Sequence, residues 1–352
     1  MSFSIPLFDV NFDEREVESV AETVRSKWIS MGRNVARLEE EMARRLGVEN
    51  VVAVSSCTAA LHLALLVAGV GPGDEVILPS LTFVATANAV KYVGGTPVFA
   101  DIVDLEDPTL NPDEIEHLVG PSTKAIIPVH YAGFPCHMNR LMEMADRHGL
   151  KVIEDAAHAI DVPLNGRKLG TYGDFGCFSL FANKVITAGE GGFVVAQSSE
   201  AAARLRLLRS HGMTTVSWDR ARGHASSYDV VDVGFNYRMD DIRAALALAQ
   251  LEKLDRILAR RKQLRCLYLE LLSDYPWLII PFRTFDGPTA NYIFPVILSE
   301  GGRNRRESVR SQLHNAGIQT SVHYPPVHQF SVYNAGRELP QTENFADQEI
   351  TL

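Results

Sequence analysis

The sequence predicts an α/β protein with a large domain, built on a mainly parallel mixed sheet flanked by helices, and a smaller C-terminal α+β domain. Two observations support this prediction. Between Val51 and Leu180, short apolar runs rich in β-branched and aromatic residues alternate with segments of helical periodicity. After about Asp240 the pattern changes to a long stretch with Ala and Leu on one face and charges on the other.

The strands and helices of the large domain alternate along residues 51–180. Ligands of such sheets bind beyond the carboxyl ends of the strands, so we expect the loops that follow the strands to carry the chemistry. The predicted strands are VVAVSS, EVILPS, PVFADI, KAIIPVH, KVIED and FGCFSL, and the helices between them are TAALHLALLVAG, FVATANAVKYVG and NRLMEMADRHG.

The small domain is expected to begin with a helical stretch over 240–272. YIFPVIL at 292–298 then predicts a strand, and RRESVRSQLHNAGI predicts a helix that ends at Gly317. We therefore place the large domain at residues 1–240, with a helical segment at its N-terminus, and the small domain at 241–352.

Composition narrows the class of ligand. The 352 residues include 34 Lys and Arg against 43 Asp and Glu, for a net charge of −9. This acidic balance argues against a nucleic-acid or membrane partner and favours a small molecule. The four cysteines are far apart and show no zinc spacing, so we expect reduced thiols in the cytoplasm and no metal. The N-terminal segment and the lack of a long apolar window predict neither export nor a membrane span.

A strand that opens directly into a helix gives the first candidate site. VSSCTAALHLAL, residues 54–65, places Ser56 and Thr58 at the start of a helix, where free backbone N–H groups attract an anion. The same residues are also typical of a simple helix cap. This segment alone therefore leaves phosphate binding and capping both open.

The second candidate site follows the apolar strand in KVIEDAAHAI, residues 151–160. Asp155 stands at the carboxyl end of this strand, where a carboxylate can anchor a cationic ring nitrogen or a metal, and His158 follows three residues later. A buried Asp that only caps the next turn is an equally good interpretation of this segment.

The third candidate site is the strongest of the three. Lys184 lies between an apolar strand and a Gly-rich turn in DFGCFSLFANKVITAGEGGFVVA, residues 174–196, where a lysine is costly to bury without a purpose. A partly desolvated lysine has a lowered pKa and can form a Schiff base with a carbonyl. Ser179, five residues earlier, offers a hydroxyl to a phosphate.

These segments together resemble the DegT/StrS family of sugar aminotransferases, which are fold type I enzymes dependent on pyridoxal 5'-phosphate (PLP). The similarity runs from about Ile5 to the last residue, and the order of the motifs makes it specific. The matching stretches are SSCTAALHLAL, PSLTFVATANAV, PVHYAGFPCHM, VIEDAAHA, GDFGCFS, NKVITAGEGG, GFNYRMDDIRAALALAQLEKLD and TSVHYPPVH.

The resemblance implies a role for each matching residue. Lys184 would bind PLP as a Schiff base and then move the proton during transfer. Asp155 would keep the pyridine nitrogen protonated. Phe83 would stack on the ring, although without the resemblance it would be taken as a core residue at a helix start. The remaining cofactor contacts would be phosphate contacts from Ser56, Cys57, Thr58 and Ser179, with Asn236 completing the phosphate site of the neighbouring subunit in a homodimer with shared active sites.

The resemblance also suggests site roles for four further residues. Relatives that act at C-4 of a nucleotide sugar often carry His at the position of His158, where an imidazole would orient Asp155 or a sugar hydroxyl; a packed histidine is the alternative. His323, Tyr324 and His328 in SVHYPPVH match a stretch near the family's active site, which makes them candidate substrate contacts.

Three features depart from the family pattern. Cys57 replaces a glycine common in SSGTAALHL, and Asp161 stands where Gly is frequent, but neither change removes a chemical group. The chain also stops at EITL, where relatives typically continue, so we expect the small domain to be truncated.

The resemblance predicts an aminotransferase that moves an amino group, with glutamate as the expected donor, to a keto sugar linked to a nucleotide, for amino-sugar, polysaccharide or natural-product biosynthesis. PLP would alternate with pyridoxamine 5'-phosphate (PMP). One alternative is a PMP-dependent sugar dehydratase of the same family, but that branch carries His in place of Lys184. Another is a non-catalytic PLP-binding regulatory protein on the same fold.

Overall fold

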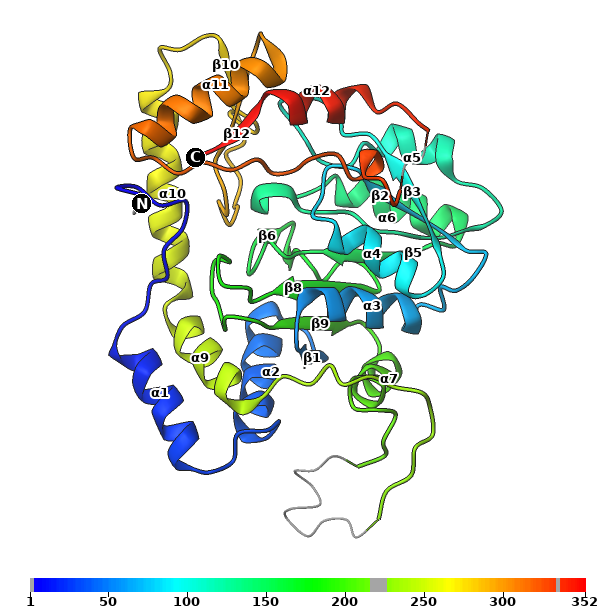
Figure 1. Ribbon diagram of the computed structural model, residues 1–352. Helices are drawn as coiled ribbons and strands as arrows, with labels where there is room; N and C mark the ends of the chain where they lie inside the picture. The colour runs from blue at the N-terminus through cyan, green and yellow to red at the C-terminus, as the bar shows by residue number, and fades with distance from the viewer. Residues whose placement is uncertain (1–2, 216–226, 334–335) are drawn as a thin grey trace.

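A seven-stranded sheet organises the large part of the chain in the computed structural model, which describes residues 3–215, 227–333 and 336–352 (Figure 1). The strand order is β1-β9-β8-β5-β4-β2-β3; the pairs from β8 to β3 are parallel, and β9 runs antiparallel to both β1 and β8. The predicted mainly parallel mixed sheet is confirmed. Its strands are β1 (Val51–Val54), β2 (Glu75–Pro79), β3 (Thr96–Ala100), β4 (Thr123–Ile126), β5 (Lys151–Asp155), β8 (Phe175–Ser179) and β9 (Gly192–Ala196).

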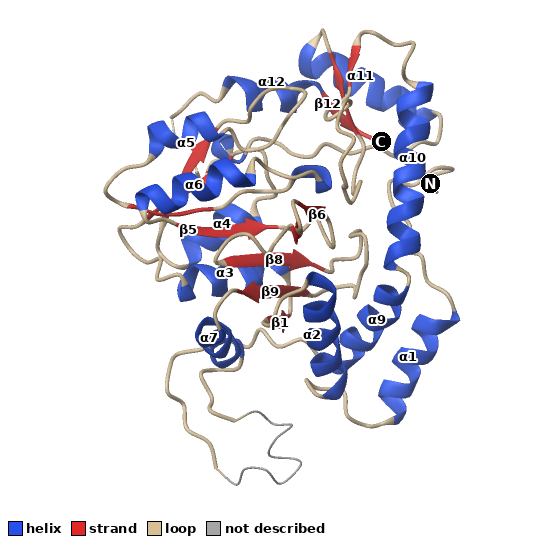
Figure 2. Ribbon diagram, turned by 180° about the vertical axis from the view of Figure 1, so that it is seen from behind, coloured by secondary structure: helices blue, strands red, loops and turns tan. Residues whose placement is uncertain are grey.

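Helices cover both faces of this sheet and form a separate apolar core on each (Figures 1 and 2). The helix that follows β1 is apolar on nearly all sides, because it lies between the sheet and two other helices. On one face lie α3 (Cys57–Val67), α4 (Ala85–Tyr92) and α7 (Ser199–Arg209), and on the other lie α2 (Arg33–Leu46), α6 (Met138–His148) and α9 (Asp241–Glu252).

The N-terminal segment is fixed to α9 by polar contacts. The first helix, α1 (Glu14–Arg25), begins at Asp13 with a capping box and packs on α9. The Asp241 carboxylate at the start of α9 accepts hydrogen bonds from the backbone N–H groups of Gly32 and Val35, at 2.9 and 3.0 Å, and so caps α2.

The predicted helical stretch over 240–272 is two helices rather than one. It breaks at Lys253, between α9 and α10 (Leu254–Leu271). The Lys253 ammonium is buried and donates to the carbonyl of Asn11 and to Glu16, which fixes the backbone at the break. No helix within the described ranges is long and apolar enough to cross a bilayer.

A small antiparallel sheet lies beside α10 at the C-terminal end of the chain (Figure 1). It confirms the predicted strand, which begins at Pro295 rather than at Tyr292. The remaining elements are α5 (Pro112–Leu118), η1 (Tyr131–Gly133), β6 (Pro163–Leu164), β7 (Arg167–Lys168), β10 (Leu278–Ile279), β11 (Pro295–Leu298), α11 (Gly302–Asn315), η2 (Val327–Gln329), α12 (Pro340–Gln348) and β12 (Glu349–Thr351).

Glu349 in β12 makes the stability of this sheet dependent on pH. Its carboxylate is 0% exposed and accepts hydrogen bonds from the His323 N–H, at 2.8 Å, and from the Thr351 hydroxyl. Burial raises the pKa of Glu349 to about 8. The unfolded chain releases this proton near pH 4.5 and the folded chain near pH 8, so stability falls as the pH rises through that window.

We therefore expect Glu349→Gln to stabilise the protein in a pH-dependent manner. The free energy of unfolding in urea should rise by about 1–3 kcal/mol at pH 8.5 and change little at about pH 4.5. Glu300→Gln, an exposed substitution after β11, is the control and should change stability by less than about 0.5 kcal/mol at either pH. An equal effect of Glu349→Gln at both pH values would contradict the assignment.

Candidate active site

Lys184 lies in the turn between β8 and β9 and faces a tyrosine from the C-terminal part of the chain. Its Nζ is 3.2 Å from the Tyr292 hydroxyl and 4.4 Å from the centroid of the Tyr292 ring. Loss of hydration lowers the pKa of Lys184 to about 8. A substantial fraction of this amine is therefore neutral, and so nucleophilic, near physiological pH.

Asp155, at the carboxyl end of β5, is a buried carboxylate held in one orientation. The Thr86 hydroxyl donates to one of its oxygens, at 2.8 Å, and the Ala157 N–H donates to the other, at 3.1 Å. Burial raises the pKa of Asp155, while these hydrogen bonds and the charge of Lys184 act in the opposite direction. Such a carboxylate is stabilised by a cationic partner, such as a protonated ring nitrogen.

His158 lies between two tyrosines. Its ring stacks on Tyr292 at a centroid distance of 4.3 Å, and its Nε2 is 3.0 Å from the Tyr324 hydroxyl. Burial and the charge of Lys184 hold the pKa of His158 well below its usual range, so the imidazole is neutral. Its Nδ1 is buried and has no hydrogen-bond partner among the described residues, which leaves it free for a polar ligand.

The predicted phosphate residues converge at the same edge of the sheet. Gly192 of β9 pairs with Val54, directly before the Ser56–Thr58 segment, and on its other side with Ser179. A Cβ at Gly192 would lie 2.7 Å from the Cys57 backbone nitrogen, so only glycine allows this approach.

Capping, one of the two interpretations of this segment, is confirmed for Ser56, and phosphate binding stays a prediction. The Ser56 side chain accepts from the Ala59 N–H, at 3.1 Å, and caps α3. The Ser179 hydroxyl accepts from the Phe181 N–H, at 3.2 Å, while Thr58 stands in the first turn of α3. The start of α3 with these hydroxyls forms a cradle of the kind that binds phosphate.

The donor set of this edge fits PLP. A partly desolvated lysine can take the carbonyl, a buried carboxylate can take the ring nitrogen, and the start of α3 can take the phosphate. The unpartnered Nδ1 of His158 offers a further polar contact. Among the residues that the structure describes, no three His, Cys, Asp or Glu side chains gather as a metal site.

Two other predicted site residues, Phe83 and Asn236, are exposed. Phe83 is 58% exposed, so it is not a core residue, and its ring is 6.0 Å from that of Tyr324. Asn236 is exposed and pairs with Ser210.

The two histidines of the SVHYPPVH stretch hold the backbone in place. His323 Nδ1 is 2.9 Å from the Thr351 hydroxyl, and its carbonyl accepts a hydrogen bond from Tyr131, at 2.6 Å. Both ring nitrogens of His328 are engaged, by Ser80 at 2.6 Å and by Glu343 at 3.0 Å. These bonds fix the loop that carries Tyr324.

The sequence does not identify two residues that contact the predicted site residues, Thr86 and Tyr292. Thr86, which orients Asp155, lies in the quoted stretch PSLTFVATANAV but was not singled out. Tyr292 was assigned only to a predicted strand, and nothing in YIFPVIL indicates that its first residue reaches Lys184. Its polar hydroxyl at the edge of an apolar run was the only available signal.

The fold and this set of side chains define a PLP-dependent enzyme of the fold type I class. The profile of the DegT/DnrJ/EryC1/StrS aminotransferase family matches residues 10–352, and the chain belongs to that family. PLP is therefore its cofactor.

Three similar proteins extend this comparison. The spore coat polysaccharide biosynthesis protein SpsC of Bacillus subtilis is 40% identical over 100% of this chain and 91% of its own length. Spr1654 of Streptococcus pneumoniae, solved in a PMP form, has a TM-score of 0.92 and 28% identity over 100% of this chain and 93% of its own. DesI, solved in the presence of its TDP-sugar product, has a TM-score of 0.88 and 32% identity over 100% of this chain and 87% of its own.

The lowered pKa of Lys184 predicts an unusual reactivity profile for its amine. In the cofactor-free protein, acetylation of Lys184 by acetic anhydride should reach half its maximum near pH 8, because desolvation disfavours the ammonium. The measurement is mass spectrometry after brief labelling across about pH 6 to 10. Lys262, exposed on α10, is the reference for a solvated amine, and a Lys184 profile that follows that of Lys262 would contradict the expectation.

Proposed function

We propose that this protein transfers an amino group from an amino donor, glutamate, to a keto sugar linked to a nucleotide. The observation that supports this most directly is that the partly desolvated Lys184 and the buried Asp155 lie at the same sheet edge, where the charge of each acts on the other. The product would enter amino-sugar, polysaccharide or natural-product biosynthesis, in the cytoplasm.

The names of similar proteins support the choice of acceptor. SpsC is named for polysaccharide biosynthesis, and DesI was solved with a TDP-sugar product. A nucleotide-linked keto sugar fits both. The presence of Lys184, rather than His, favours transamination over the dehydratase reaction.

Each residue of the site has a part in this reaction. Bound PLP supplies an electron sink for the carbon from which a proton is removed. Asp155 holds the ring nitrogen protonated, and Thr86 keeps its carboxylate aimed there. Lys184, as a neutral amine, would take the proton from the donor's α-carbon. The Tyr292 hydroxyl orients the Lys184 amine through a hydrogen bond.

The reaction would proceed in two halves. In the first, the donor gives up its amine, gains the oxygen of one water molecule and leaves as a 2-oxo acid; in the second, the keto carbon of the sugar takes the amine and its oxygen leaves as water. The neutral His158, stacked on Tyr292, limits water around Lys184 and leaves Nδ1 for a cofactor or sugar oxygen.

The first test is the visible absorption spectrum of the protein with PLP, followed by glutamate. We expect an absorption band from protein-bound PLP that decreases when glutamate is added. In a separate sample, borohydride should attach the cofactor permanently to Lys184. Lys184→Ala should keep the fold and lose both covalent attachment and turnover by at least about 10³-fold. Asp155→Ala should still bind PLP but convert slowly.

The outcomes separate the candidate functions. Failure of every amino donor to change the bound PLP would favour a PLP-binding regulatory protein. Conversion by glutamate, with loss of a sugar hydroxyl instead of amination when a nucleotide keto sugar is added, would favour a dehydratase. Wild-type turnover in Lys184→Ala would exclude the proposed mechanism.

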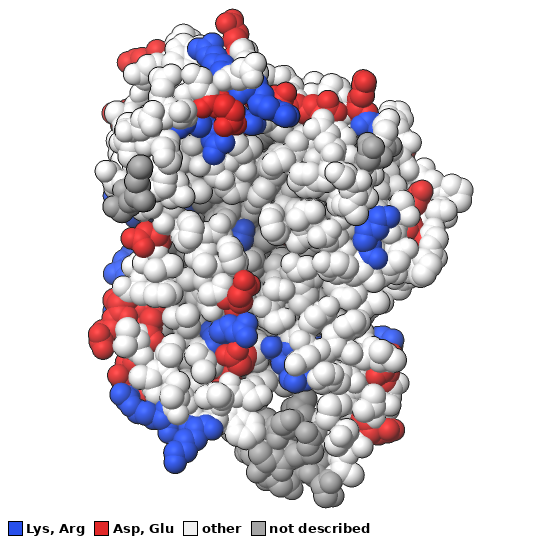
Figure 3. Space-filling view, viewed as in Figure 1, with Lys and Arg blue, Asp and Glu red and all other residues white. Residues whose placement is uncertain are grey.

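We further propose a homodimer in which Asn236 serves the partner's site. Asn236 is exposed, and the face over α3 and α4 carries few charged side chains in Figure 3. Exposed aromatic side chains, Phe83, Tyr92 and Phe181, are the kind of groups that an interface buries.

Mixing two inactive variants tests the shared site. Lys184→Ala and Asn236→Ala should each be inactive, but heterodimers formed on co-expression carry one intact site, so activity should return to roughly a quarter of wild type. If Asn236 serves its own subunit, or if no dimer forms, the mixture should stay as inactive as its parents. Sedimentation distinguishes these two outcomes.

A further inference from the structure

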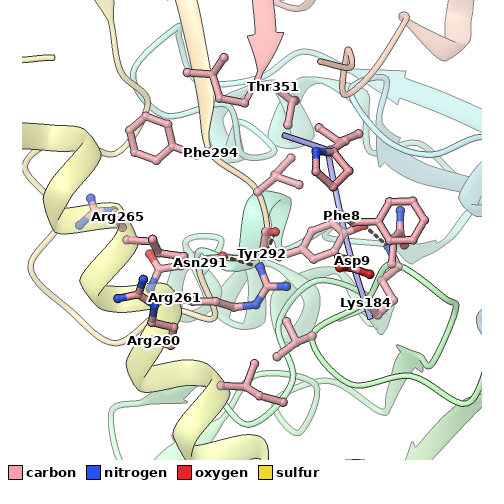
Figure 4. Close-up of a pocket in the computed structure, with 18 of the residues that line it drawn as sticks. Phe8, Asp9, Lys184, Arg260, Arg261, Arg265, Asn291, Tyr292, Phe294 and Thr351 are labelled. Atoms are coloured by element: carbon pink, nitrogen blue, oxygen red, sulfur yellow. Dashed lines mark hydrogen bonds between the residues drawn. The ribbon is translucent and has the colours of Figure 1, made fainter. Parts of the chain in front are cut away.

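A cavity of about 870 Å³ extends from Lys184 to the helix α10. It lies between the Lys184 turn, the segment around Tyr292 and the N-terminal stretch, and Figure 4 shows Lys184, Tyr292 and Arg261 around it. Its volume is in the range of small-molecule sites. It opens on the reactive amine, so a ligand held there would have one end at Lys184.

The lining of this cavity is cationic, although the protein as a whole has a net charge of −9. Asp9 is the one carboxylate side chain among the described residues of the lining. Against it stand the cationic side chains of Lys184, Arg256, Arg260, Arg261 and Arg265. A cavity with this charge concentrates small anions.

Arg261 on α10 is bonded to the backbone of Tyr292, the residue that contacts Lys184. Its Nη1 donates to the carbonyls of Asn291, at 3.2 Å, and Tyr292, at 2.9 Å. These acceptors are neutral, and in the described part of the chain Arg261 makes no ion pair. Arg265, by contrast, donates to the Phe282 carbonyl and lies over an aromatic ring. Arg261 is thus pre-oriented, with Nε and Nη2 left for an anion.

Two side-chain amide oxygens in the same lining also lack partners among the described residues. The side-chain oxygens of Asn183, next to Lys184, and Asn291, next to Tyr292, are buried without a hydrogen-bond partner among the described residues. Asn291 is only 9% exposed. Buried amides of this kind are expected to bind a polar ligand or water. The cavity therefore offers polar groups at both of its ends.

We propose that Arg261 binds the distal carboxylate of a dicarboxylic amino donor. Tyr292 contacts both groups: its hydroxyl is bonded to the Lys184 amine, and its carbonyl accepts a hydrogen bond from Arg261. Figure 4 shows Lys184 and Arg261 on opposite sides of Tyr292, so a donor whose amine reacts at Lys184 would meet Arg261 with a carboxylate at the far end of its chain. This inference rests on the proposed aminotransferase function and names the recognition element of its donor.

The test measures binding without chemistry. Glutarate has two carboxylates and no amine, and butyrate has one carboxylate on a similar chain. Calorimetric titration of the PLP-loaded protein should show glutarate binding at least tenfold tighter than butyrate. Arg261→Met should weaken glutarate binding at least tenfold and leave butyrate nearly unchanged.

Two further variants make the result specific. Lys262→Met removes a positive charge from the neighbouring position of α10, outside the cavity lining, and should change neither affinity more than twofold. Arg261→Lys keeps a donor for the two carbonyls but loses the planar fork, so it should lie between wild type and Arg261→Met. Unfolding temperatures of all variants confirm that each is folded.

Several results would overturn the inference. They are absence of glutarate binding, equal affinities for glutarate and butyrate, and equal losses in Arg261→Met and Lys262→Met. A loss of affinity for uridine diphosphate, but not for glutarate, in both Arg261 variants would assign the anion to the nucleotide of the acceptor instead. None of these results depends on turnover, so the conversion of bound PLP by glutamate still tests the proposed function separately.

Discussion

The cost of burying charge at the carboxyl edge of the sheet is the constraint around which the site is built. Asp155 is only 6% exposed, and the chain gives its carboxylate two hydrogen bonds, from Thr86 and Ala157. Lys184, whose charge acts on Asp155, is itself partly desolvated, and its pKa is lowered to about 8. Neither group is fully stabilised by the protein alone. A cofactor with a cationic ring and a reactive carbonyl satisfies both.

The same constraint explains the contribution of the C-terminal part of the chain. Tyr292 and Tyr324 are brought to the sheet edge from outside it and enclose His158. Both are held through backbone contacts: Arg261 fixes the carbonyl of Tyr292, and His323 is tied to β12 through Glu349. The tyrosines remove water from the site, which is what lowers the pKa of Lys184. The small sheet therefore influences the chemistry without providing its nucleophile.

Sequence reasoning predicted the fold well where structure follows local pattern. Each strand run between Val51 and Leu180 forms a strand, because a parallel sheet covered on both faces requires continuous apolar runs. It was less accurate where a contact between residues far apart in the sequence determines where a helix ends. The break at Lys253 depends on Glu16 and Asn11, which lie far away in the sequence. A helical pattern alone continues through that position.

The sequence by itself determined the family and predicted the site residues Lys184, Asp155 and the start of α3. Each lies at, or within a few residues after, the carboxyl end of a strand, and the carboxyl ends of parallel strands meet at one edge, so local order along the chain places them together. Only the tertiary structure decided their partners. Tyr292 meets Lys184 across 108 residues and Thr86 meets Asp155 across 69, and no local pattern encodes such contacts. They arise when packing brings separate elements together and excludes water, which sets the pKa of Lys184.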